Sequence, residues 1–180
     1  MILEVKNFLP NTGDVRAHAL ASNWGNLVAF DGEVYGRVCQ TVVPGLREAL
    51  EAAVGPLFML GEGYRLNYEN ETPNHAIHVD GGWGTHAVVV YLSETPSLQG
   101  KTGTAFWTYK GQDDPEDHTD NPEEWTLDYL CHEEFGKCVI YTSDQYHSRW
   151  PLEAYGTDAE SGRLIAVAFF NPLNEDLTNG

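Results

Sequence analysis

The chain has 180 residues, a length that suits one domain with a single hydrophobic core. Its 27 acidic and 10 basic residues give a formal net charge of −17, and such a field repels nucleic-acid phosphates and anionic membranes. We therefore expect no direct nucleic-acid partner and no membrane partner, whereas the acidic surface suits a cationic or neutral substrate. The three cysteines form no paired framework, and no apolar run approaches the ~20 residues that span a bilayer. Together these features predict a cytoplasmic protein.

The expected elements begin with a strand in MILEVKNFL and a helix in GDVRAHALAS. A turn-rich piece, NWGNLVAFDGEVYG, precedes a second helix in VPGLREALEAAVG, where Pro44 lies near the start and Gly55 follows the end. From residue 57 onward, short apolar runs alternate with turn residues, which is typical of strands. The strands expected there are FMLGEGYRLNYEN, HAIHVD, THAVVVYLS, GTAFWTY, GKCVIYTS and RLIAVAFFN.

Helices followed by seven or eight strands predict an α+β, mainly β domain. We expect a double-stranded β-helix, a cupin-like jelly roll, with the N-terminal helices packed on one sheet. Residues 1–180 are expected to form a single domain, with a strand and supporting helices in 1–56 and the jelly-roll core in 57–172. The acidic segment 110–134 is predicted to be an insert made of a surface excursion or short helices. It is either a lid over a site or a solvated loop.

The stretch NHAIHVDGGWGTH carries three histidines and one aspartate. On a strand, His78 and Asp80 point to the same face because they are two residues apart, whereas His75 faces the other side. His147, in CVIYTSDQYHSRWP near the end of another apolar strand, is the candidate third ligand. Two histidines and one carboxylate form the facial triad of non-haem Fe(II), which leaves positions open for O₂ and a co-substrate. Three further histidines are expected to be core or solvent-facing, namely His86, His118 and His132.

Arg163 opens the apolar strand RLIAVAFFN, sixteen residues after His147. An inward-facing arginine at this position is costly unless an anion accompanies it, and its planar fork suits a carboxylate. Arg65 and Arg149 are rival candidates for binding an anion. The alternative is that Arg163 is partly exposed and bonds an acidic neighbour.

Four segments together resemble the Fe(II)- and 2-oxoglutarate-dependent oxygenases, and within them the prolyl-hydroxylase-like branch: HVDGGWGTHAVVVYLS, GKTGTAFW, YTSDQYHSRWP and RLIAVAFFN. The resemblance covers most of residues 57–172 and extends more loosely to the opening strand and helix. It implies that His78, Asp80 and His147 bind Fe(II), and that no catalytic residue is needed beyond this metal centre.

The resemblance also implies a pocket for 2-oxoglutarate. Arg163 would pair with the distal carboxylate, Tyr91 would hydrogen-bond the same carboxylate, and Tyr68 would line the pocket. Thr104 matches a threonine of the glycine turn. The alternative for Tyr68 and Tyr91 is packing in the hydrophobic core, and the alternative for Thr104 is a purely structural role. Two features depart from the branch, namely the long interval between His147 and Arg163 and the absence of a clean Gly-Gly turn before Thr104.

The implied activity is hydroxylation of a C–H bond in an unidentified small-molecule or peptidyl substrate. It would consume 2-oxoglutarate and O₂ and release succinate and CO₂. Asp80 argues against a halogenase, in which a small residue in place of the carboxylate leaves room for halide. The alternative function is a cupin-like metalloenzyme that uses the same triad without 2-oxoglutarate. A third possibility is a non-catalytic β-sandwich binding module in which the histidines are incidental.

Overall fold

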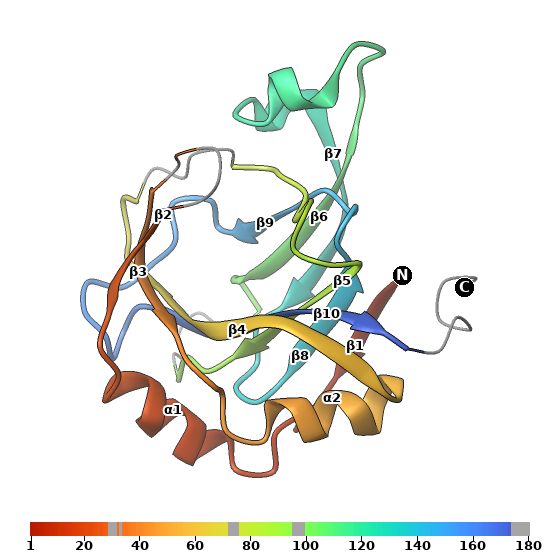
Figure 1. Ribbon diagram of the computed structural model, residues 1–180. Coiled ribbons are helices and arrows are strands. Elements are labelled where there is room, and N and C mark those ends of the chain that lie inside the picture. Colours follow the sequence, from red (N-terminus) through yellow and green to blue (C-terminus); the bar gives the residue numbers. More distant parts are fainter. Residues whose placement is uncertain (29–31, 33, 72–75, 95–99, 174–180) are drawn as a thin grey trace.

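The computed structural model describes residues 1–28, 32, 34–71, 76–94 and 100–173 (Figure 1). His75, whose side chain the sequence predicts to face away from His78, lies outside these residues. Among the described residues, no helix has the length and hydropathy needed to cross a membrane.

Two antiparallel sheets form a double-stranded β-helix, as expected from the sequence (Figure 1). Within the described residues, the larger sheet has the strand order β1-β8-β5-β10-β4-β3-β2, and the smaller sheet has the order β7-β6-β9. The larger sheet comprises β1 (Ile2–Val5), β2 (Gly25–Val28), β3 (Val34–Gln40), β4 (Leu57–Asn67), β5 (His86–Tyr91), β8 (Cys138–Thr142) and β10 (Arg163–Pro172). The smaller sheet comprises β6 (Gly103–Tyr109), β7 (Trp125–His132) and β9 (His147–Trp150).

Two helices, α1 (Thr12–Leu20) and α2 (Leu46–Val54), cover the outer face of the larger sheet (Figure 1). In α2 the buried residues are Leu46, Leu50 and Val54, whose spacing of four places them on one stripe. The helix ends before Gly55, whose φ of 83° suits glycine. This arrangement confirms the prediction that the N-terminal helices pack on one sheet.

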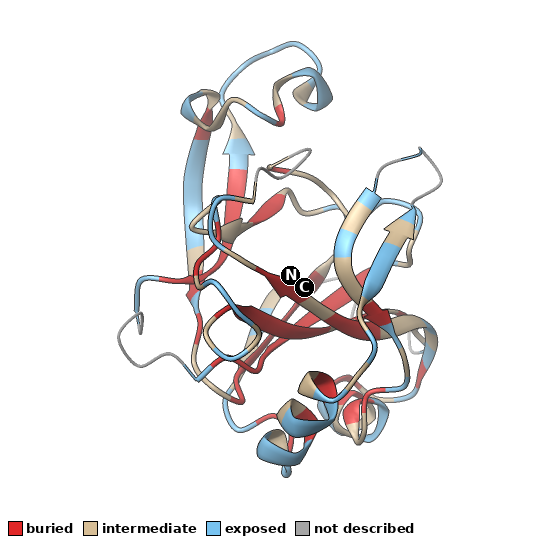
Figure 2. Ribbon diagram, turned by 90° about the vertical axis from the view of Figure 1, so that its left-hand side faces the viewer, coloured by how far each residue is buried: buried red, intermediate tan, exposed pale blue. Residues whose placement is uncertain are grey.

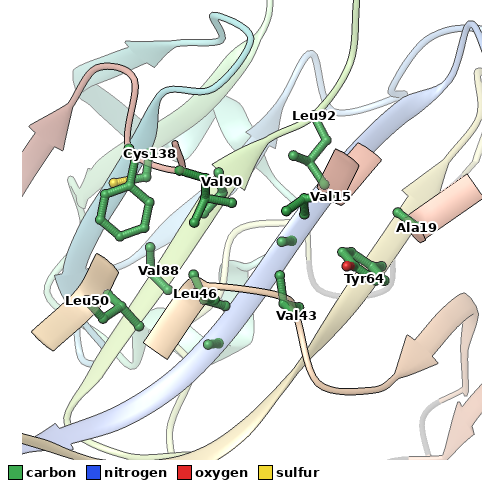
Figure 3. Packing of buried hydrophobic residues seen from close by; sticks show 14 of the residues in the cluster. Val15, Ala19, Val43, Leu46, Leu50, Tyr64, Val88, Val90, Leu92 and Cys138 are labelled. Atoms are coloured by element: carbon green, nitrogen blue, oxygen red, sulfur yellow. The ribbon is translucent and has the colours of Figure 1, made fainter. Parts of the chain in front are cut away.

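The central strands of the larger sheet are buried on both faces, which explains their continuous apolar sequences. In β5, Val88 and Val90 pack toward the helices with Leu50 (Figure 3). Val89 and Tyr91 belong to a second core between the two sheets. Because alternate side chains of a strand point to opposite faces, residue parity tells which side chains reach the space between the sheets.

Three segments differ from the sequence predictions. The turn-rich piece contains the β2–β3 hairpin, which extends the larger sheet. HAIHVD forms no regular strand in its described part, where His78 makes an isolated bridge with His147. The acidic segment 110–134 contains strand β7 near its end, and residues 126–129 of this strand are all exposed, so its apolar pattern is weak.

The rest of the acidic segment, residues 110–124, is the expected surface excursion. It contains the short helices η2 (Pro115–His118) and η3 (Pro122–Glu124), projects from the end of the smaller sheet and is mostly exposed or half-buried (Figure 2).

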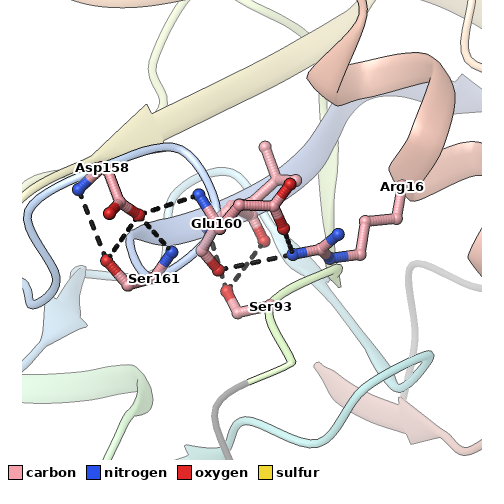
Figure 4. A network of polar contacts seen from close by, with 6 residues as sticks. Arg16, Ser93, Asp158, Glu160 and Ser161 are labelled. Atoms are coloured by element: carbon pink, nitrogen blue, oxygen red, sulfur yellow. Dashed lines mark hydrogen bonds and ion pairs between the residues drawn. The ribbon is translucent and has the colours of Figure 1, made fainter.

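The long connection between β9 and β10 is a folded loop that is tied to α1. Asp158 accepts hydrogen bonds from the backbone and hydroxyl of Ser161, each at 2.8 Å (Figure 4). Glu160 forms an ion pair with Arg16 of α1 at 2.7 Å. The extra length therefore lies outside the sheets, and β10 still begins at Arg163.

Candidate metal centre

His78, Asp80 and His147 lie together, with one potential ligand atom from each within 4.8 Å of the others. His78 Nε2 is 3.8 Å from Asp80 Oδ1, and His147 Nε2 is 3.3 Å from Asp80 Oδ2. Ligand atoms ~2.1 Å from a metal and at right angles to one another are ~3 Å apart. Small side-chain rotations would therefore bring this set into a facial arrangement.

Backbone pairing holds the three residues in place, although the expected regular strand is absent. The His78 N–H donates to the His147 carbonyl at 3.0 Å, and the His147 N–H donates to the His78 carbonyl at 2.9 Å. The Asp80 N–H donates to the Ser143 carbonyl at 2.9 Å. His147 itself opens β9, after a turn that separates it from β8. The geometry thus agrees with the hypothesis that His78 and Asp80 converge with His147. The three residues are held together by the isolated β-bridge between His78 and His147, and not by a regular strand through His78 and Asp80.

A second layer of hydrogen bonds orients the candidate ligands. His147 Nδ1 lies 2.9 Å from the Gln145 carbonyl, which can only accept, so Nδ1 donates there and Nε2 is the ring nitrogen that faces Asp80. The Tyr141 hydroxyl donates to Asp80 Oδ2 at 3.0 Å and lies 3.1 Å from His147 Nε2. Burial, followed by the charge of Asp80, raises the Tyr141 pKa well above its ordinary value, so the phenol stays a neutral donor.

The centre is enclosed on one side and open on the other. The side chains of His147 and Asp80 are 7% and 13% exposed, whereas that of His78 is 37% exposed. Residues 110–124 border the centre, because the Thr119 carbonyl accepts the N–H of Ile77 at 3.0 Å. Whether this excursion closes over the site as a lid stays a prediction.

Arg163 is buried, with 3% of its surface exposed. One guanidinium nitrogen donates to the Gly103 carbonyl at 3.3 Å, and its Nε has no partner among the described residues. No ion pair involves Arg163 within the described part of the chain, so the partly exposed, acid-paired arginine considered from the sequence does not match the structure. A buried guanidinium with unused donors is suited to an incoming carboxylate.

Tyr91 and Thr104 lie near Arg163, between the sheets. The Tyr91 hydroxyl donates to Thr104 Oγ1 at 2.8 Å. Tyr91 is the register partner of Ile165, two residues from Arg163. Burial raises the Tyr91 pKa well above its ordinary value, while the charge of Arg163 opposes the shift.

Tyr68 is placed elsewhere. It packs against the core that faces the helices, and the Arg37 guanidinium lies 4.3 Å from the centre of its ring. The structure does not bring Tyr68 together with the other candidates, so we leave it out of the proposed co-substrate site.

Three further described histidines, which the sequence predicts to be core or solvent-facing, lie outside this group of candidate ligands. His86 is a core residue stacked on Phe170 with a centroid distance of 5.6 Å, and burial lowers its pKa. His118 is half-buried and pairs with Asp113 and Glu124 in the excursion. His132 is exposed.

No protein-family model matches the chain, and no curated protein matches it. Solved structures do match. SnoN, a non-haem α-ketoglutarate-dependent epimerase from nogalamycin biosynthesis, has a TM-score of 0.61 and 17% identity over 94% of this chain and 77% of its own. The carbocyclase SnoK, described with the same co-substrate and pathway, has a TM-score of 0.56 and 12% identity over 94% and 79%. Iron-bound EctD from S. alaskensis has a TM-score of 0.55 and 10% identity over 94% and 72%.

At these identities the likeness establishes a shared fold. The chain has the double-stranded β-helix of proteins that include α-ketoglutarate-dependent and iron-binding ones, and its own residues must carry any argument about chemistry.

Proposed function

We propose that the protein is a non-haem Fe(II)- and 2-oxoglutarate-dependent oxygenase that hydroxylates a C–H bond of a small-molecule or peptidyl substrate. The observation that carries this proposal is the triad of His78, Asp80 and His147, with ligand atoms within 4.8 Å of one another. Arg163 supports it, because a buried cation with unused donors stands in the space between the same sheets.

Each group has a distinct task in this proposal. Bound Fe(II) would supply the O₂ chemistry that protein side chains lack. The triad would hold the metal on one side and leave the opposite side for 2-oxoglutarate and O₂. Arg163 would hold the distal carboxylate of 2-oxoglutarate, and the Tyr91–Thr104 hydrogen bond would fix the wall beside it. Atoms balance when 2-oxoglutarate, O₂ and the substrate yield succinate, CO₂ and the hydroxylated product.

Hydroxylation is the outcome we propose, although SnoN and SnoK are described as an epimerase and a carbocyclase. Product analysis distinguishes these outcomes, because hydroxylation adds one oxygen atom to the substrate and epimerisation leaves its mass unchanged. Membership of the prolyl-hydroxylase-like branch stays a prediction from the sequence motifs.

The test measures binding and turnover on purified protein. We expect one Fe(II) per chain, metal-dependent binding of 2-oxoglutarate by calorimetry, and succinate formation in air. His78→Ala should reduce succinate formation to the level of protein-free Fe(II), whereas His132→Ala, an exposed histidine, serves as the matched control. Turnover retained in His78→Ala would contradict the proposal.

Two other results would favour the rivals. If Fe(II) binds but 2-oxoglutarate neither binds nor is consumed, the cupin-like metalloenzyme without this co-substrate replaces the proposal. If no metal binds, the non-catalytic binding module replaces it.

A further inference from the structure

Three arginines from three strands reach the space between the two sheets. Arg65 in β4 is the register partner of Ile165 in β10, two residues from Arg163, so Arg65 and Arg163 are diagonal neighbours on one face. Arg149 in β9 is the register partner of Thr104 in β6. The Thr104 hydroxyl accepts a hydrogen bond from Tyr91 of the larger sheet, so this face of the smaller sheet points toward the larger one. Burial, followed by the charges of Arg65 and Arg163, lowers the Arg149 pKa to about 10. The three guanidinium groups are therefore close enough to repel one another.

Arg149 already has partners. Its guanidinium donates to the backbone carbonyls of Leu152 and Glu71, and it lies 3.4 Å from the Glu71 carboxylate. The same carboxylate also pairs with Arg37. Glu71 is thus shared between two cations, and Arg149 has a structural role in this cluster.

Arg65 is different, because it has no hydrogen bond or ion pair among the described residues. Its guanidinium lies 4.9 Å from the centre of the Tyr35 ring, and its buried Nε lacks a partner. The residue as a whole is half-buried, and a partly desolvated guanidinium beside a second cation is unfavourable unless an anion joins it. Burial, followed by repulsion from the charge of Arg163, lowers the Arg65 pKa.

We propose that Arg65 binds an anionic oxygen group, a carboxylate or a phosphate, on the primary substrate. This inference rests on the proposed function, in which 2-oxoglutarate occupies Arg163 and leaves Arg65 as a second, separate cation. The charge of Asp80 also acts on Arg65, so a group bound there lies within electrostatic reach of the metal centre. The acidic surface alone suggests a cationic or neutral substrate, whereas the interior selects an anionic one.

The test uses acetate as the probe, because it is small enough to enter any site that admits a substrate carboxylate. The protein is loaded with Zn(II), a redox-inert stand-in for Fe(II), and saturated with 2-oxoglutarate to block the metal and Arg163. Saturation-transfer NMR of the acetate methyl protons then gives its affinity. We expect saturable binding of acetate and none of neutral acetamide. Competition by inorganic phosphate reports whether the site takes phosphate as well as carboxylate.

Arg65→Gln should weaken acetate binding by ~10–100-fold, the value of a charge-assisted hydrogen bond, while the affinity for 2-oxoglutarate changes less than about twofold. Retained 2-oxoglutarate binding also shows that the variant is folded. Arg65→Lys should keep part of the acetate affinity, since the charge remains and the planar fork is lost. Arg47→Gln, an exposed arginine of α2, is the matched control and should change neither affinity.

Three results would overturn the inference. They are the absence of acetate binding to the wild type, equal acetate binding in Arg65→Gln, and loss of 2-oxoglutarate binding in Arg65→Gln comparable to the loss in Arg163→Gln. Failure of the wild type to bind 2-oxoglutarate contradicts the proposed function instead. If the wild type does not bind 2-oxoglutarate, acetate binding is compared between wild type and Arg65→Gln in metal-free protein. Weaker acetate binding in Arg65→Gln would still assign the anion site to Arg65.

Discussion

The Tyr141 hydroxyl stands beside the candidate ligands, although no sequence motif singles it out. Its hydrogen bond to Asp80 Oδ2 holds one carboxylate oxygen and leaves the other free to turn toward a metal. Only the fold reveals this contact, because Tyr141 belongs to an apolar strand whose inward face cannot be told from its outward face by composition.

We expect Tyr141→Phe to weaken metal binding by ~10–100-fold, the usual effect of removing a hydrogen bond that orients a ligand. The measurement is a calorimetric titration with Fe(II) under anaerobic conditions. Tyr129→Phe is the control, because Tyr129 is an exposed tyrosine whose hydroxyl bonds Glu4 of β1 rather than a candidate ligand. Equal affinities in wild type and Tyr141→Phe would show that Asp80 needs no such support.

The candidate ligands were predictable, whereas the way they are held was not. The motif of His78 and Asp80 and the distant His147 could be read from residue types and spacing. Their reciprocal hydrogen bonds depend on a contact between segments far apart in sequence. Tyr68 illustrates the limit, because the family resemblance implied a place in the co-substrate pocket, whereas the side chain packs against the helix-facing core.

Among the elements, α2 was predicted closely because its burial follows a helical stripe. β7 was missed because a strand at the edge of the smaller sheet exposes most of its side chains and shows little alternation. Elements buried on a defined face are thus readable from sequence, whereas an edge strand as exposed as β7 is not.

Leu50→Ala tests the packing of α2 on the larger sheet. Leu50 is fully buried, so we expect a loss of about 2–5 kcal/mol in the free energy of unfolding. Urea denaturation followed by circular dichroism measures it. Glu48→Ala, on the exposed side of the same helix, should change the free energy by less than ~0.5 kcal/mol. Similar losses in both variants would mean that the burial of Leu50 is not the source of the loss.

The net charge of −17 acts on the whole molecule. Because like charges repel most strongly in the compact state, added salt should stabilise the fold. Raising the ionic strength from ~10 mM to ~150 mM shortens the Debye length from about 30 Å to about 8 Å. We expect the melting temperature to rise by a few degrees, equally in potassium chloride and choline chloride. A fall in melting temperature would indicate that surface ion pairs outweigh the repulsion.

The position of β10 has a consequence for synthesis of the chain. This strand lies between β4 and β5, and its partners are made long before it. Until residues 163–172 leave the ribosome, β4 and β5 each present an unpaired edge. The larger sheet can therefore close only after residues 163–172 have been made, and until then the β4 and β5 edges are open to pairing with other strands.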